Sequence, residues 1–211
     1  MDIFGTQWSN HWQRISQHWR EVVDADDIVL IPGDISWAMT LDEAMADLLA
    51  IGDMPGRKLM IRGNHDYWWS GITKVRLALP EGLMALQNDA IRLADTVICG
   101  TRGWTMPGDK TDDNDEKIYV REISRMRMSL DAARKLSPDG RVIAMTHYPP
   151  VDEQGAPSQM SELFEEYAIG DVVYGHLHGA ALKSAFIGAA RGVTYHQVSC
   201  DRLNFTLYTF A

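Results

Sequence analysis

The chain has 211 residues, of which 45% are hydrophobic and 23% are charged; these values are typical of a globular domain and argue against disorder. A formal net charge of -9 argues against general nucleic-acid binding and against a surface for anionic membranes. The two cysteines, Cys99 and Cys200, lie in apolar stretches, so we expect buried thiols and no disulfide framework.

The length favours a single domain over residues 1–211. The residues near Met1 lack the pattern of a secretion signal, and no apolar span long enough for a membrane follows. We therefore expect a cytoplasmic protein that does not contact a membrane.

The first predicted elements are a helix, a strand and a second helix. Residues 8–23 are expected to form an amphipathic helix, because apolar residues recur there with a helical period at Trp8, Trp12, Ile15, Trp19 and Val22. An apolar strand follows over residues 27–31 and ends at Pro32-Gly33, which leaves Asp34 in a bend. Thr40 and Glu43 have the spacing of a capping box, which predicts a helix over residues 41–51.

The stretch Gly63-Asn64-His65-Asp66 directly follows an apolar strand predicted over residues 58–61. Catalytic groups of α/β proteins commonly lie where such strands end. Asn64 offers a hard oxygen ligand, and His65 offers a nitrogen that binds metal or moves a proton. Asp66 is placed to fix the orientation of His65. The alternative interpretation is a polar turn that caps the next helix.

The second half of the chain alternates helices with strands, which indicates an α/β protein. The expected helices span residues 70–79, 116–135 and 161–168, and the expected strands span residues 90–93, 96–100, 142–146, 171–174, 192–199 and 203–210. Arg102 follows one of these strands, and its paired donors suit an anionic group such as phosphate. A surface arginine paired with an acidic neighbour is the alternative. Residues 109–116 are polar and rich in acidic side chains, which favours a solvated loop. The alternative is a mobile lid over the site.

Three further apolar runs end in side chains that can bind metal. Asp34 follows the strand over residues 27–31, His147 follows residues 142–146, and Gly175-His176-Leu177-His178 follows residues 171–174. Oxygen and nitrogen ligands without thiolate suit Mn, Fe or Zn. Histidines at positions i and i+2 of an extended segment point to opposite sides, so the chain must bend there if both reach one site. The alternative is that all four stretches are structural turns.

In this order the four stretches resemble the calcineurin-like metallophosphoesterases, whose pattern is D-x-H, G-D, G-N-H-D or G-N-H-E, a lone His, and G-H-x-H. The resemblance covers nearly the whole chain from Asp27 onward and implies an α/β sandwich of two mixed β-sheets flanked by helices. A bacterial-type subgroup, which supplies no substrate, shares three stretches with this chain: Met1-Asp2-Ile3-Phe4, Gly33-Asp34-Ile35-Ser36-Trp37 and Ser199-Cys200-Asp201.

The resemblance implies two divalent transition-metal ions and the hydrolysis of a phosphomonoester or phosphodiester by attack of metal-bound hydroxide. The substrate would be a small phosphorylated molecule, and we predict that Arg102 contacts its phosphate. By resemblance Asp34 bridges the metals, His178 binds one of them, and Asn64, His147 and His176 complete the ligands of the other. His65 is then the acid that protonates the leaving oxygen, and Asp66 orients it.

The chain departs from the family pattern at the D-x-H motif, because none of its seven histidines has an aspartate two residues before it. We therefore expect a domain truncated at its N-terminus, with the first strand missing and one metal site incomplete. The alternative function is a metal-binding protein of the same fold with little or no catalytic activity.

Overall fold

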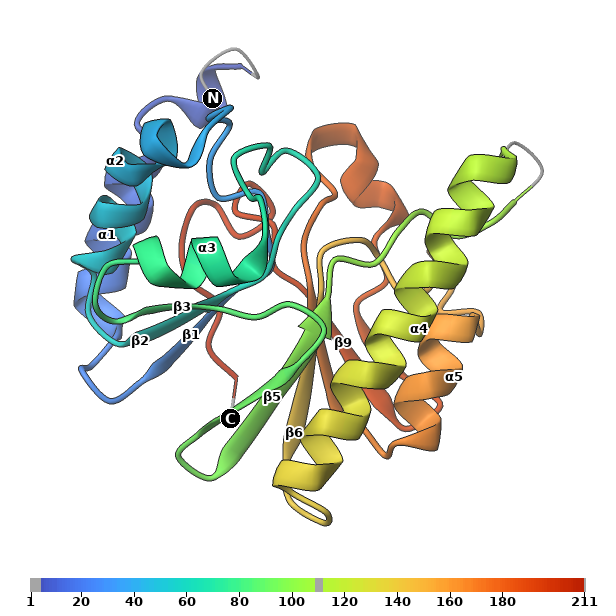
Figure 1. Cartoon of the computed structure of the whole chain (residues 1–211). Coiled ribbons are helices and arrows are strands. Elements are labelled where there is room, and N and C mark those ends of the chain that lie inside the picture. The colour runs from blue at the N-terminus through green and yellow to red at the C-terminus, as the bar shows by residue number, and fades with distance from the viewer. Residues whose placement is uncertain (1–4, 109–111, 211) are drawn as a thin grey trace.

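The computed structural model describes residues 5–108 and 112–210 and contains two β-sheets (Figure 1). The first sheet has three parallel strands in the order β1 (Ile28–Ile31), β2 (Arg57–Met60) and β3 (Leu83–Ala85). The second sheet has six strands in the order β4-β5-β6-β7-β9-β8. These strands are β4 (Ala90–Leu93), β5 (Thr96–Thr101), β6 (Val142–Thr146), β7 (Asp171–Tyr174), β8 (Gly188–Ala190) and β9 (Val193–Gln197).

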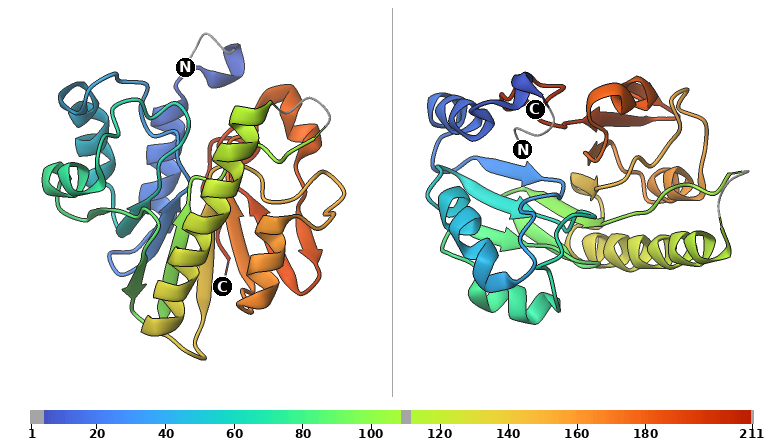
Figure 2. Two further views of the ribbon diagram at one scale, coloured as in Figure 1. Left: turned by 45° about the vertical axis from the view of Figure 1, so that its right-hand side comes forward. Right: turned by 90° about the horizontal axis from the view of Figure 1, so that it is seen from above.

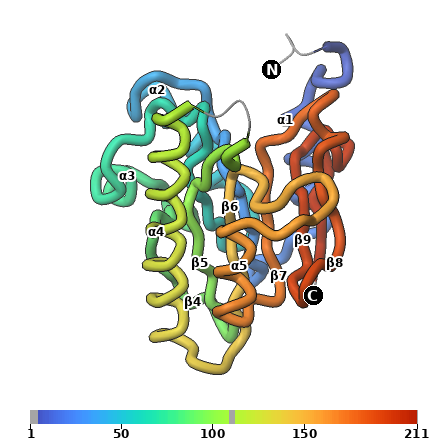
Figure 3. The backbone as a smooth tube through the Cα atoms, turned by 90° about the vertical axis from the view of Figure 1, so that its right-hand side faces the viewer, coloured from blue at the N-terminus to red at the C-terminus, as the bar shows by residue number. Residues whose placement is uncertain are grey.

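Helices cover the outer face of each sheet, as the views in Figures 1 and 2 show. The three-stranded sheet packs against α1 (His11–Val22), α2 (Leu41–Gly52) and α3 (Ile72–Ala78). The six-stranded sheet packs against α4 (Asp113–Leu136) and α5 (Gln159–Glu166), which lie side by side on its outer face in Figure 3. Two 3-10 turns, Thr6–Trp8 and Gly179–Ser184, complete the described elements.

A separate apolar layer joins the inner faces of the two sheets. Its fully buried members come from β2, from β4 to β7 and from the adjoining loops: Leu59, Ile61, Leu86, Leu93, Ile98, Ile143, Met145 and Val173. The alternation of side chains along each strand places one set in this layer and the other set under the helices. The prediction of an α/β sandwich is therefore confirmed, although the three-stranded sheet is wholly parallel rather than mixed.

The predicted helices and central strands agree with the structure to within a few residues. The capping box of α2 is present, because the Thr40 side chain accepts from Glu43 N and the Glu43 side chain accepts from Thr40 N. The acidic run was predicted as a loop, yet α4 already begins at Asp113. The predicted lid over residues 109–116 lies partly outside the described residues, at positions 109–111.

The predicted closing strand over residues 203–210 is wrong. Asn204 and Phe205 have φ angles of 52° and 61°, so the chain turns there and leaves the extended conformation. Residues 206–210 then run without strand pairing in the described part of the chain, and Leu207 N donates to His18 Nδ1 on α1. No helix in the described ranges is both long and apolar enough to cross a membrane.

Candidate metal centre

The predicted ligands follow the carboxyl ends of parallel strands and lie at one edge of the fold. Asp34 follows β1, Asn64 follows β2, His147 follows β6 and His176 follows β7. The carboxyl ends of neighbouring parallel strands meet at the same edge of a sheet, and the two sheets face each other there. Asp34, His147 and His176 each offer a ligand atom within 4.8 Å of the others.

Asn64 lies between the two histidines of this group. Its Oδ1 is 2.6 Å from His147 Nε2 and 2.9 Å from His176 Nδ1, and these two ring nitrogens are 3.1 Å apart. Asp34 Oδ2 is 3.5 Å from His147 Nε2. One carboxylate, one amide oxygen and two imidazole nitrogens therefore converge on a small volume.

The tautomer of His147 shows that this donor set fits a cation. His147 Nδ1 donates to the carbonyl oxygen of Pro32 at 2.8 Å, so Nε2 of the neutral ring carries a lone pair. Nε2 faces Asn64 Oδ1, which also carries lone pairs. Burial lowers the pKa of His147 to about 4 and also lowers the pKa of His176. Both rings are therefore neutral near pH 7, the form in which imidazole binds metal.

Two of the candidate ligands have left-handed backbone conformations. Asp34 has φ 58° and His176 has φ 67°. At His176 this bend is closed by a hydrogen bond from Leu177 N to Gly175 O at 2.8 Å. The predicted bend in the H-x-H stretch is present, and strained residues of this kind gather at functional sites.

Glycines allow the backbones at this edge to come close together. A Cβ on Gly63 would lie 2.1 Å from Asp34 Oδ1 and 2.2 Å from Asp34 N. A Cβ on Gly33, whose φ is 93°, would lie 2.7 Å from the Gly63 backbone. Only glycine fits this approach between the loops that follow β1 and β2.

The described hydrogen bonds of the Asp66 carboxylate do not include the His65 ring, in contrast to the orienting role that we expected. It is fully buried and accepts from five donors: Gly63 N, Asp34 N, Ile35 N, Ser36 N and Trp68 Nε1. Burial raises the pKa of Asp66. His65 lies instead beside Trp37, with ring centroids 5.1 Å apart, and its Nδ1 is 3.2 Å from the Tyr67 hydroxyl. Asp66 thus holds the Asp34 loop against the Gly63 turn.

His178 belongs to a neighbouring group of side chains. Its Nδ1 donates to Asp201 Oδ1 at 2.8 Å, and its ring, Cys200 and Asp201 offer ligand atoms within 4.8 Å of one another. Asp201 was named in the sequence analysis only within the shared stretch Ser199-Cys200-Asp201 and was given no role at the site. The signal that could have identified it is its place after a predicted strand, since Cys200 and Asp201 follow the largely buried strand β9, the parallel neighbour of β7.

Arg102 follows β5 beside the candidate centre. Its carbonyl oxygen accepts from His147 N at 2.9 Å and from Tyr148 N at 3.0 Å. Its guanidinium lies 4.5 Å from the ring centroid of Trp104, and burial lowers its pKa. Trp104 contacts Tyr148, whose ring centroid is 4.1 Å from that of His176. A row of aromatic rings therefore connects Arg102 with His176, one of the candidate metal ligands.

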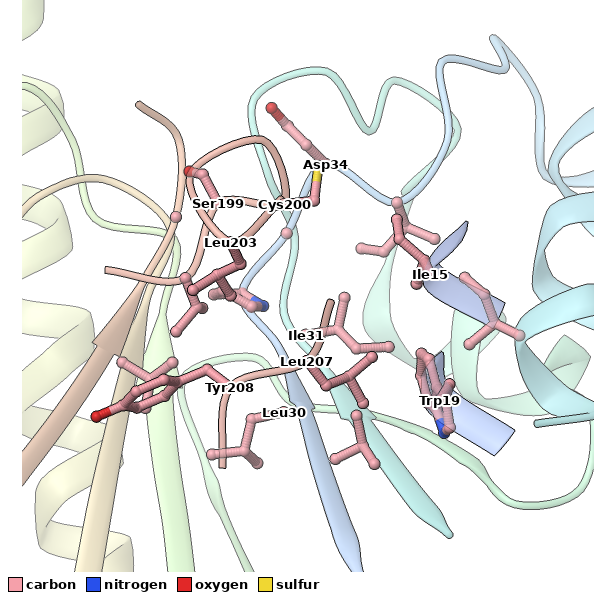
Figure 4. A pocket seen from close by; sticks show the side chains of 18 of the residues that line it. Ile15, Trp19, Leu30, Ile31, Asp34, Ser199, Cys200, Leu203, Leu207 and Tyr208 are labelled. Atoms are coloured by element: carbon pink, nitrogen blue, oxygen red, sulfur yellow. The ribbon is translucent and has the colours of Figure 1, made fainter. Parts of the chain in front are cut away.

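A cavity of about 1250 Å³ opens from this edge between α1, β1 and the six-stranded sheet. Figure 4 shows Asp34, Ser199 and Cys200 at one end, with the apolar side chains of Leu30, Ile31, Leu207, Ile15 and Trp19 further along it. His65, His176 and His178 also line it. Apolar walls with a few convergent polar groups are typical of ligand sites.

The family model described as calcineurin-like phosphoesterase matches residues 2–180. The Gene 66 protein of Mycobacterium phage L5 is 46% identical over 56 residues, which are 26% of this chain and 27% of that protein. The match thus spans about a quarter of that relative. A crystal structure titled as a protein of unknown function, AQ665 from Aquifex aeolicus, aligns with a TM-score of 0.46 and 13% identity, covering 93% of this chain and 79% of that chain.

Proposed function

The chain belongs to the calcineurin-like phosphoesterases, and from this premise we propose that it is a metal-dependent hydrolase of a phosphomonoester or phosphodiester. The observation that carries the proposal is the convergence of Asp34, Asn64, His147 and His176 from the ends of four strands. Nitrogen and oxygen donors of this kind suit Mn, Fe or Zn.

The four converging residues hold the metal in this proposal. A divalent ion there supplies Lewis acidity, which neutralises phosphoryl charge and lowers the pKa of water. His147 contributes Nε2 because Pro32 O engages its Nδ1, whereas His176 faces Asn64 through Nδ1. The buried carboxylate of Asp66 keeps Asp34 in place through the hydrogen bond to Asp34 N.

His65 is the proposed acid for the leaving oxygen. It sits on the turn that also carries Asn64, and its ring is held between Trp37 and Tyr67. The Tyr67 hydroxyl contacts Nδ1, so Nε2 remains to deliver a proton. Proton transfer by a positioned histidine contributes about 10²–10⁴-fold in rate.

Arg102 is the proposed contact for the substrate phosphate. A hydrogen bond to a charged group contributes about 1.5–3 kcal/mol, so Arg102→Ala should raise KM by about 10-fold or more with kcat little changed. Arg127→Ala is the matched control, because Arg127 pairs with Glu166 on the outer helices. Steady-state kinetics on a small aryl phosphate measure both values, and an unchanged KM in Arg102→Ala would remove the contact.

A metal-binding protein with little turnover is the second candidate function. The observation that favours it is the position of His178, whose ligand atom groups with Cys200 and Asp201 and not with Asp34. A centre that holds one metal lacks the paired ions that clamp both oxygens of an in-line displacement.

The test compares metal content and hydrolysis in the wild type, His147→Ala and His196→Ala. His196 serves as the control because it bonds to Asp171, a residue at the amino end of β7 and remote from the centre. We expect elemental analysis to find Mn, Fe or Zn in the wild type and in His196→Ala but not in His147→Ala. We also expect hydrolysis of an aryl phosphate or an aryl phosphodiester with Mn. Equal and negligible metal in all three proteins would exclude the proposed centre, and metal without hydrolysis of either ester would favour the second candidate.

A further inference from the structure

His178 is fixed by a carboxylate from another loop. The residue lies between β7 and the 3-10 turn Gly179–Ser184, and 36% of its side chain is exposed. Its Nδ1 donates to Asp201 Oδ1 at 2.8 Å, and its ring centroid is 5.5 Å from that of Trp8. An imidazole this exposed keeps one orientation only if a partner holds it.

Asp201 is itself held rigidly. Only 8% of its side chain is exposed, and its oxygens also accept from Gly179 N at 2.8 Å and from Arg202 N at 3.1 Å. The loop that carries Asp201 is tied back to β9 by Arg202, whose guanidinium donates to Gln197 O. The amide of Gln197 donates to Leu177 O and so ties the neighbouring His178 loop to the same strand. The parallel pairing of β7 with β9 brings the two loops to the same edge.

The hydrogen bond determines which ring nitrogen of His178 is available. A carboxylate only accepts, so Nδ1 carries the proton and Nε2 of the neutral ring carries the lone pair. His147 has the same arrangement, with Pro32 O as the acceptor for Nδ1. His178 lines the same cavity as Asp34 and His176, although its ligand atoms group with Cys200 and Asp201.

We propose that Asp201 is a positioning residue that keeps His178 in the Nδ1–H tautomer and thereby presents Nε2 to a metal ion. The proposal rests on the proposed metal-dependent function, and it adds His178, which the resemblance implies as a ligand, to the four converging residues. Histidines that bind metal usually donate their second nitrogen to such a partner, and loss of the partner typically weakens metal binding by about 10–100-fold.

A competing arrangement uses the same three residues directly. Cys200, Asp201 and His178 Nδ1 would then bind the ion as a sulfur, oxygen and nitrogen set. Burial raises the pKa of Cys200 to about 12, so the thiol would have to lose its proton on binding. The hydrogen bonds already made to both oxygens of Asp201 favour the positioning role over this one.

The first measurement is the tautomer of His178 in the metal-free protein, by nitrogen-15 NMR of the imidazole rings. His178→Ala identifies the resonances. We expect Nδ1–H in the wild type and in Asp201→Asn, which keeps an acceptor oxygen, and loss of this preference in Asp201→Ala. A wild-type His178 protonated on Nε2 would overturn the proposal, whether or not the protein binds metal or is active.

The second measurement is a titration of the same proteins with cobalt(II), followed by its absorption. We expect Asp201→Ala to weaken one binding event by about 10–100-fold. Asp171→Ala should leave it unchanged, because Asp171 lies at the opposite end of β7. It is a matched control, since it makes an equally short bond to a histidine, His196. Equal affinity in Asp201→Ala and the wild type would overturn the proposal. A thiolate-to-cobalt absorption band that disappears in Cys200→Ser and persists in Cys99→Ala would also overturn it, in favour of direct binding.

The two measurements separate this proposal from the proposed function. If the wild type binds no cobalt while His178 keeps the Nδ1–H tautomer, the metal proposal fails and the role of Asp201 in fixing the ring stands. If cobalt binds tightly but with the same affinity in Asp201→Ala, the metal proposal stands and the positioning role fails.

Discussion

At the scale of single residues, the candidate centre depends on backbone conformations that cost free energy. The left-handed conformations of Asp34 and His176 cost on the order of 1–3 kcal/mol each, so other groups must hold them. Asp66 does this for Asp34, because its carboxylate accepts from three successive backbone N–H groups at Asp34, Ile35 and Ser36. Asp66 therefore acts on the Asp34 loop and not on the ring of the neighbouring His65.

This role leads to a prediction for Asp66→Asn. The side-chain NH2 of the substituted asparagine would face backbone N–H groups from which Asp66 now accepts. Some of those buried N–H groups would then lack an acceptor. We expect the free energy of unfolding to fall by about 1.5–3 kcal/mol, the usual contribution of a hydrogen bond to a charged group, and metal content to fall with it. Urea denaturation and elemental analysis measure the two effects. Unchanged stability with reduced turnover alone would instead support a direct catalytic role for Asp66.

His65 should behave in the opposite way. Its ring makes no contact with the Asp34, His147 and His176 group among the described hydrogen bonds, so His65→Ala should retain the metal. Turnover should fall by about 10²–10⁴-fold if the ring protonates the leaving oxygen. Metal content and kcat are measured side by side, with His196→Ala as the control. Loss of metal from His65→Ala would identify His65 as a ligand.

At the scale of elements, strand β2 carries a buried lysine. Lys58 is 2% exposed, and its ammonium donates to the carbonyl oxygens of Gly52 and Met54 at 2.9 and 2.6 Å. These carbonyls lie at the C-terminus of α2, where a cation is favourable. Burial lowers the pKa of Lys58 from 10.5, and the charge of Asp53 opposes this.

The lowered pKa predicts the direction of a pH effect on stability. Between the folded pKa and 10.5 the unfolded chain binds a proton that the folded protein has released, so the stability contributed by Lys58 rises with pH in this window. The unfolding free energy of the wild type minus that of Lys58→Met should therefore be larger at about pH 10 than at about pH 8. Subtraction of Lys58→Met removes the effects of other groups. A difference that shrinks over the same interval would mean that the folded pKa is raised.

Local patterns predicted the elements wherever local chemistry determines the structure. The apolar runs before Asp34, Asn64, His147 and His176 indicated strands, and parallel strands necessarily bring their carboxyl ends together. The acidic stretch before α4 was misinterpreted because Asp112 is its N-cap, accepting from Asn114 N and Asp115 N. Acidic residues in a first turn complement the helix dipole, which a loop assignment overlooks.

Contacts between distant segments could not be predicted in this way. The partner of Asp66 is a loop about 30 positions earlier, and the partner of His178 is Asp201. Their geometry depends on how the two sheets face each other, which residue spacing does not determine. The apolar residues at 203–210 matched a strand pattern, yet the turn at Asn204 and Phe205 directs that segment toward α1.

At the scale of the whole molecule, the proposed metal joins two halves of the fold. Asp34 and Asn64 follow strands of the three-stranded sheet, whereas His147 and His176 follow strands of the six-stranded sheet. An ion bound by all four would therefore connect both sheets at one edge, and the large cavity beside β1 lies next to that connection. Because an unfolded chain does not hold these four groups together, metal binding should stabilise the folded protein as a whole.

This linkage predicts a thermal shift that depends on the ligands. A ligand present at about 100 times its dissociation constant contributes about 2.7 kcal/mol, and for a chain of this length each kcal/mol raises Tm by about 2–4 °C. Addition of Mn, Fe(II) or Zn to the metal-free protein should therefore raise Tm by about 5–10 °C, and a chelator should reverse the rise. His147→Ala should show little shift relative to its own metal-free baseline, whereas His196→Ala should shift as the wild type does. An equal shift in His147→Ala would place the bound ion elsewhere, for example on exposed carboxylates of this acidic chain.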